Sequence, residues 1–117
     1  MESPIDGFYA AYLTGREGNS FAMFLLRRGV VAGADIVGGT YDGSIESISN
    51  GGHKVKVTTR TPPNLPMIQG GMSGPGGDTS EAEFVLPSTF LAEPFISIET
   101  RNGPVNARLV KLRGIDD

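Results

Sequence analysis

Residues 29–43, GVVAGADIVGGTYDG, decide which kind of fold this chain can adopt. The stretch holds five glycines in fifteen residues and lies between two strand-like runs. Such a density of glycine indicates close backbone approach, sharp bends or positive φ angles that a side chain would disfavour. Because the stretch has no histidine, cysteine or lysine, it favours a barrel or sandwich architecture over an active site.

The composition is that of one globular domain spanning residues 1–117, with 38% hydrophobic and 20% charged residues. A net charge of −3 argues against a nucleic-acid partner, which would require a basic surface. The chain has no cysteine, which excludes disulfides, a thiol nucleophile and cysteine-based metal sites. No apolar run approaches the roughly 18 residues of a membrane span. The first residues, MESPIDG, lack a signal-peptide pattern, so we expect a cytoplasmic protein with no membrane partner.

Eight strand-like runs separated by turn residues predict an all-β fold. The run 53–61 alternates cleanly, with Val55, Val57 and Thr59 on the inward face and basic or polar residues outward. The run 20–27 is apolar on both faces, which indicates a strand that is covered on both sides. The predicted strands are 8–13, 20–27, 30–36, 40–49, 53–61, 81–86, 95–100 and 105–112.

The turns between these runs predict how the strands connect. Asn50-Gly51 and Asn102-Gly103 mark hairpins, and Asn-Gly fits a type I′ turn because both central φ angles are positive. The segment 87–93 can form at most one short helical turn. Sequential hairpins favour an eight-stranded antiparallel, lipocalin-like β-barrel, with a β-sandwich as the alternative. Such a barrel holds packed side chains or one small ligand.

The segment 62–80, PPNLPMIQGGMSGPGGDTS, interrupts the rhythm of strands with four prolines and five glycines. We expect a flexible loop here, and loops of this length are usually functional or disordered. Its glycines lack the Lys-Ser/Thr pair of a P-loop and lead into no helix, so they do not predict a phosphate site. Four apolar residues of the loop can fold onto the barrel, form a lid or bind a partner: Leu65, Met67, Ile68 and Met72.

Few residues form a catalytic or metal-binding pattern. His53 is the only histidine, and its place after a turn predicts an exposed strand residue. Asp35, Asp42 and Glu46 are close in sequence but do not match a calcium loop, and we expect the two aspartates to cap turns beside glycines. An enzyme would need His53, a carboxylate and a hydroxyl in one cleft. We therefore predict no catalytic residue, no metal and no cofactor.

Aromatic residues of the first hairpin are the candidate binding residues. They form the barrel core, line a cavity or make an exposed interface patch. A carrier of a small apolar ligand would need Phe8, Tyr12, Phe24 and their neighbours to line a void of about 300 Å³ or more. The aromatic residues of this hairpin are Phe8, Tyr9, Tyr12, Phe21 and Phe24.

One spaced set of residues in the first third of the chain is more specific than any single motif. It runs D-G-x-Y, then G-x-x-x-G-x-D, then Y-x-G, and it resembles the pattern of the GrlR family of negative regulators of type III secretion. The resemblance covers residues 6–45 and implies a lipocalin-like homodimer that is not an enzyme and that sequesters a transcriptional regulator. At 46–50 the chain has ESISN, where the best-known member has an acidic run. The matching residues are Asp6, Gly7, Tyr9, Gly29, Gly33, Asp35, Tyr41 and Gly43.

Overall fold

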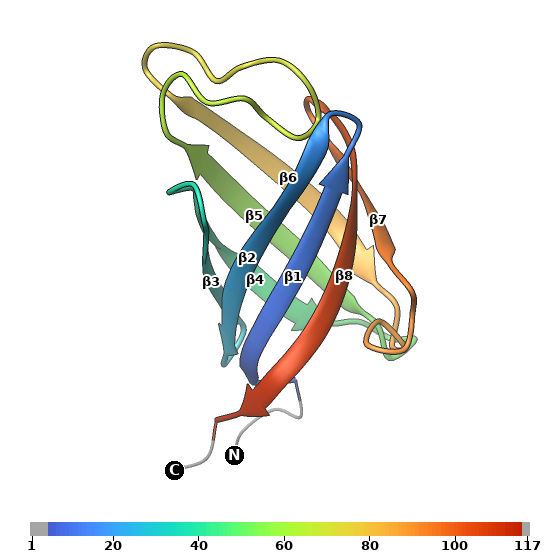
Figure 1. The fold of residues 1–117 in the computed structure, drawn as a ribbon. Helices are drawn as coiled ribbons and strands as arrows, with labels where there is room; N and C mark the ends of the chain where they lie inside the picture. Colours follow the sequence, from blue (N-terminus) through green and yellow to red (C-terminus); the bar gives the residue numbers. More distant parts are fainter. Residues whose placement is uncertain (1–4, 116–117) are drawn as a thin grey trace.

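The computed structural model describes residues 5–115 and contains eight antiparallel strands that curl into a nearly closed barrel (Figure 1). The strand order is β6-β5-β4-β3-β2-β1-β8-β7, so all eight strands belong to one sheet rather than to a two-sheet sandwich. This confirms the predicted eight-stranded, all-β barrel. The strands are β1 (Gly7–Gly15), β2 (Gly18–Arg27), β3 (Val30–Asp35), β4 (Thr40–Ser47), β5 (His53–Thr61), β6 (Asp78–Leu86), β7 (Ile96–Thr100) and β8 (Gly103–Gly114).

One strand begins earlier than the sequence predicted, while segment 87–93 agrees with the predicted limit of one short helical turn. β6 begins at Asp78, because residues 78–80 continue the ladder opposite residues 59–61 of β5, so the connecting loop is 62–77. Segment 87–93 forms hydrogen-bonded turns: the Phe90 amide donates to the Pro87 carbonyl at 3.0 Å. Within residues 5–115 no helix forms, and none could therefore cross a membrane.

The β2–β3 turn is the type I′ turn of this barrel. Its central residues, Arg28 and Gly29, have φ angles of 51° and 80°. The buried carboxylate of Asp6 accepts the Arg28 amide at 3.3 Å, which stabilises a non-glycine residue in this unusual conformation. Hairpins form at both Asn50-Gly51 and Asn102-Gly103, but the type I′ geometry predicted for them is wrong, because neither asparagine has a positive φ angle. The connection between β4 and β5 spans residues 48–52, which is too long for a two-residue turn.

Gly33 shows why the opening stretch needs glycine. It lies on the inner face of β3, paired with Phe24 of β2 and Tyr41 of β4. A Cβ at Gly33 would lie 2.5 Å from the Phe24 ring. Without that atom, the Phe24 and Tyr41 rings meet across β3 with centroids 5.1 Å apart. Gly43 is similarly crowded, because a Cβ there would collide with the Lys56 carbonyl oxygen.

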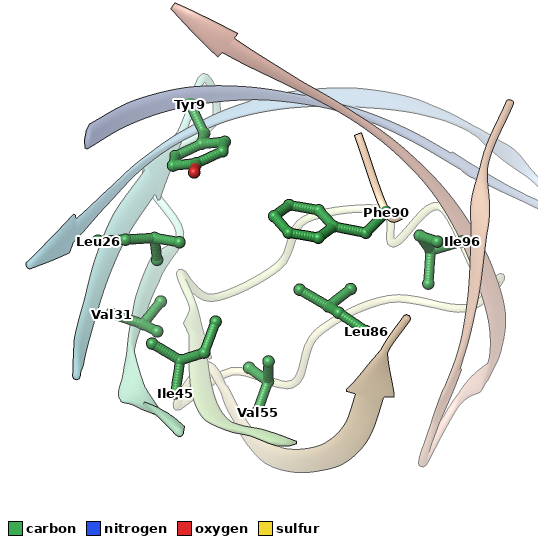
Figure 2. Close-up of a cluster of buried hydrophobic side chains, with 8 residues drawn as sticks. All are labelled: Tyr9, Leu26, Val31, Ile45, Val55, Leu86, Phe90 and Ile96. Carbon is green, nitrogen blue, oxygen red and sulfur yellow. The ribbon is translucent and has the colours of Figure 1, made fainter. Parts of the chain in front are cut away.

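An apolar cluster lies at the lower end of the barrel, where β1 begins and β8 ends (Figure 1). Figure 2 shows its side chains converging from the surrounding strands, with Phe90 entering from the β6–β7 connection. The Tyr9 hydroxyl donates to the Ile5 carbonyl at 2.6 Å, and burial, aided by the Asp6 charge, raises the pKa of Tyr9 to about 12. The cluster comprises Tyr9, Leu26, Val31, Ile45, Val55, Leu86, Phe90 and Ile96.

The barrel has one seam, between β6 and β7, where the neighbouring strands do not share a hydrogen-bonded ladder. At the upper end of this seam, the Arg101 guanidinium contacts the Asp78 carboxylate at 2.6 Å. Arg101 belongs to the β7–β8 turn and Asp78 opens β6, so this ion pair spans the gap that the ladder leaves.

Candidate functional site

The two-residue period of the strands divides the five candidate aromatic residues between two surfaces. Tyr9 and Phe24 point into the barrel and line its lumen. Phe8 and Tyr12 are on the outer surface, 39% and 48% exposed. Phe21 joins them, because its ring stacks edge-on against Tyr12 at 5.3 Å. The candidate set therefore contributes both to the core and to an exterior patch.

The exterior patch, here called the outer apolar face, covers β8, β1, β2 and β3, which are consecutive in the sheet. Figure 1 shows β8, β1 and β2 side by side. Apolar side chains meet across the ladder, as where Met23 pairs with Ala10 and leaves Ala10 only 2% exposed. The Arg108 guanidinium lies 5.6 Å from the Tyr12 ring centroid at one border. The face comprises Phe8, Tyr12, Phe21, Met23, Leu25, Val30 and Val110.

The opposite outer surface, on β4, β5 and β6, is charged instead. Lys54 contacts Glu83 at 3.1 Å. Arg60 contacts Asp42 at 3.5 Å. Asp42 therefore forms an ion pair on the surface, and the prediction that it caps a turn is wrong. Because the same strand alternation gives a solvated surface here, the outer apolar face is a local feature and not a general property of the barrel.

The lumen contains a cavity of about 220 Å³, and most residues of the apolar cluster line its lower part. This is below the 300 Å³ expected for a carrier of drug-sized ligands. The walls are apolar toward the lower end, where Phe24 and Phe84 contribute rings, and more polar toward the upper end. Phe8 and Tyr12, which were expected among the lining residues of such a void, point outward instead.

Asp35 organises the polar part of the lumen. One carboxylate oxygen accepts the Tyr41 hydroxyl at 2.8 Å. The other accepts the backbone amides of Gly39 at 2.7 Å and Val37 at 3.1 Å, which is the turn-capping role predicted for Asp35. Burial, and then the hydrogen bond and charge of Asp35, raise the pKa of Tyr41 well above its ordinary value. Tyr41 is therefore a neutral donor at physiological pH.

Residues 62–77 fold over the upper end of the lumen (Figure 1). The loop is closed on itself by Ser73, which is 3% exposed: its hydroxyl donates to the Pro62 carbonyl at 2.6 Å and accepts the Leu65 amide at 2.9 Å. These bonds define the path of the loop, while its flexibility stays a prediction. Of the four candidate partner residues, Met67 and Ile68 line the cavity, Leu65 is half-buried and Met72 is 60% exposed.

The residues considered for catalysis or metal binding lie apart. His53 is half-buried, not exposed as predicted, because it points to the inner face, where its ring meets Phe90 edge-on at 5.9 Å. Asp35 faces the lumen, whereas Asp42 and Glu46 face outward, as the alternation of β4 requires. Among residues 5–115 no group of three or more potential ligands is arranged to hold a metal ion.

The sequence argument missed a set of hydroxyl groups that line the cavity. Ser20, Thr59, Thr61 and Ser80 contribute to its walls, and their side chains form no hydrogen bond with the described part of the chain. The alternation of residues 53–61 places Thr59 inward, and this is the signal in the sequence for part of the set.

Comparisons with known proteins add no further assignment. No family model matches the chain, and no curated protein or solved structure matches it. The functional argument rests on the geometry of the barrel and on the motif residues quoted above.

Proposed function

We propose that this protein is a non-catalytic regulatory module that forms a homodimer through its outer apolar face and sequesters a transcriptional regulator. The outer apolar face is the observation that carries the proposal. Contiguous exposed apolar patches on soluble proteins mark interaction sites, and aromatic, methionine and arginine side chains are enriched in interfaces.

A second copy of the chain fits this face. A two-fold contact places the same patch against itself, so an apolar centre can be buried without an unpaired charge. The centre here is Met23 and Leu25, which are uncharged. Arg27 and Arg108 lie at the borders, where they stay solvated in such a contact.

The resemblance to the GrlR family supports the proposal that the partner is a transcriptional regulator. The motif residues have coherent structural roles in this barrel: Asp6 and Gly29 form the β2–β3 turn, and Gly33, Asp35 and Tyr41 form one packed unit. A partner would bind away from the dimer contact. Of the apolar loop residues, Met72 is the most accessible for that purpose.

Light scattering coupled to size-exclusion chromatography tests the dimer. We expect a dimer for the wild-type protein at high micromolar concentration and a monomer for Met23→Glu, because the substitution places a charge at the centre of the contact. The matched control is Val85→Glu, which alters an exposed valine on β6, outside the outer apolar face. A monomeric wild-type protein, or equal effects of the two variants, would contradict the proposal.

Affinity capture from the native cell, followed by mass spectrometry, tests the partner. We expect a transcriptional regulator to be recovered with the wild-type protein and to be depleted with Met72→Glu. Ser88→Glu is the control, since Ser88 is an exposed residue in a turn at the opposite end of the barrel. Recovery of no regulator with the wild-type protein would argue against a sequestering role.

A further inference from the structure

We infer that the barrel lumen binds a small neutral amphiphile: an apolar body with one hydrogen-bonding end, such as a medium-chain alcohol or amide. The inference is independent of the dimer and of the protein partner proposed above. It rests on the size of the cavity, on the absence of available charge in its walls and on the hydroxyl groups at its upper end.

The size of the cavity sets the size of the ligand. A dry protein cavity of about 150 Å³ accommodates benzene, with six heavy atoms. On that scale, the cavity of about 220 Å³ holds on the order of nine heavy atoms. The apolar body would rest on the rings of Phe24 and Phe84 and against the apolar cluster at the lower end.

The charges around the cavity favour a neutral ligand. No lysine, arginine or histidine is among the described residues that line it, so an anionic head group finds no counter-charge. Two carboxylates line it, but Asp35 already accepts three hydrogen bonds and Asp78 is paired with Arg101 at 2.6 Å. A cationic head group would therefore have to compete with these existing partners for either carboxylate. Burying either kind of unpaired charge is strongly unfavourable.

The hydroxyl groups supply the hydrogen-bonding end. Thr59 and Ser80 are opposite each other on β5 and β6, and Thr61 is the next inward residue of β5. Their hydroxyls, with that of Ser20 on β2, make no hydrogen bond within residues 5–115. Each can donate and accept, so together they can satisfy an alcohol, carbonyl or amide group.

The arrangement of the loop suggests the route of entry. Hydrogen bonds connect the loop 62–77 to the β1–β2 and β7–β8 turns. The Glu17 amide donates to the Ile68 carbonyl at 2.7 Å, and the Gln69 amide group donates to Thr100 Oγ1 at 3.3 Å. At the β3–β4 turn, Val37 lines the cavity and is still 52% exposed. A ligand would enter beside Val37.

Three probes that share one alkyl chain test the charge preference on the full-length protein at neutral pH: 1-octanol, octanoate and octylamine. We expect 1-octanol to bind in calorimetric or NMR titrations, with chemical-shift changes at lumen residues. Octanoate and octylamine should bind at least about tenfold more weakly, since their charges would remain unpaired in the lumen. Absence of 1-octanol binding, or equal binding of either charged probe, would overturn the inference.

Variants of the lumen test the location of the site. Ala82→Leu fills the cavity from β6 and should weaken 1-octanol binding by more than about tenfold. The double variant Thr59→Val/Ser80→Ala keeps the shape of the walls but removes two hydroxyls, and should weaken 1-octanol binding about three- to tenfold. If Ala82→Leu does not fold, the result for the double variant decides whether 1-octanol binds in the lumen.

Thr58→Val is the control, because Thr58 is on the outer surface of the same strand as Thr59. Circular dichroism and thermal melting establish that each variant is folded before titration. A folded Ala82→Leu protein that binds 1-octanol as tightly as the wild type would place the probe on the outer apolar face and refute a lumen site. Equal losses for Thr58→Val and the double variant would refute the role of the inward hydroxyls.

Discussion

Because Gly33 has no side chain, the rings of Phe24 and Tyr41 can pack against each other across β3. Gly33→Ala would place a methyl group 2.5 Å from the present position of the Phe24 ring, so Phe24 or the strand must move. We expect the free energy of unfolding to fall by about 1–3 kcal/mol, as for overpacking elsewhere. Urea denaturation measures the change. Gly76→Ala is the control, because a Cβ there meets nothing within 4 Å, and a comparable loss in both variants would contradict this account.

The raised pKa of Tyr9 predicts how stability depends on alkaline pH. Since the folded protein holds this proton to a pKa of about 12, against 10.0 for an ordinary tyrosine, the associated stability is complete below pH 10 and is lost as the pH rises toward 12. Tyr9→Phe lacks this ionisation. The variant is expected to be less stable than the wild type at pH 8, with a difference that narrows above pH 10. Denaturation curves at several pH values check this; parallel profiles would contradict it.

Residue roles were predictable where a local rule decides them. The glycines that follow Asp35 predicted that it caps a turn, and the structure shows that cap. For Asp42 the same rule failed, because Arg60 is opposite it only after β4 and β5 have paired. The prediction that His53 is exposed was wrong for a similar reason. Its burial depends on Phe90, which is distant in the sequence and belongs to the β6–β7 connection.

At the scale of elements, the loop 62–77 is stabilised by one buried hydroxyl. Ser73→Ala removes the donor to the Pro62 carbonyl and leaves the Leu65 amide without its acceptor. We expect a loss of about 1–3 kcal/mol, the cost of leaving buried polar groups unsatisfied, together with faster proteolysis within the loop. Ser88→Ala, at an exposed position, is the control. Unchanged proteolysis of Ser73→Ala would mean that other contacts hold the loop.

The existence of all eight strands followed from sequence pattern, whereas some of their ends did not. The two-residue period is strong in β5, whose predicted bounds of 53–61 are the observed ones. β6 starts earlier than predicted, because its first residues pair with β5 although they follow a run rich in glycine and proline. Ladder formation between strands thus extends strands beyond what the local composition indicates.

At the scale of the whole molecule, the proposed homodimer makes thermal stability depend on concentration. A ligand or subunit that binds only the folded state stabilises it by mass action. We therefore expect the melting temperature of the wild-type protein to rise with protein concentration in differential scanning calorimetry, and that of Met23→Glu to stay constant. Identical concentration dependence in the two proteins would contradict a dimer formed through the outer apolar face.

The outer apolar face and the cavity differ in how far each could be predicted from the sequence. The prediction that both faces of the strand at 20–27 are covered is wrong, because Met23 on the outer face of β2 is 47% exposed. That β2 has an outward apolar set could nevertheless be anticipated from this run. The cavity could not, since its volume depends on how far Phe90 and the loop 62–77 enter the lumen from outside the strands. Such a volume is a property of the closed barrel and not of any segment.

The pairing of β1 with β8 has a consequence for synthesis. These strands are joined from Gly7 opposite Gly114 to Thr14 opposite Asn106, so the first strand of the barrel meets its second neighbour only when the eighth strand has been made. Until β8 leaves the ribosome, the nascent chain has an unpaired edge on β1, next to a run of exposed apolar side chains. The barrel therefore cannot close before β8 is available, and until then the open edge of β1 can pair with other chains.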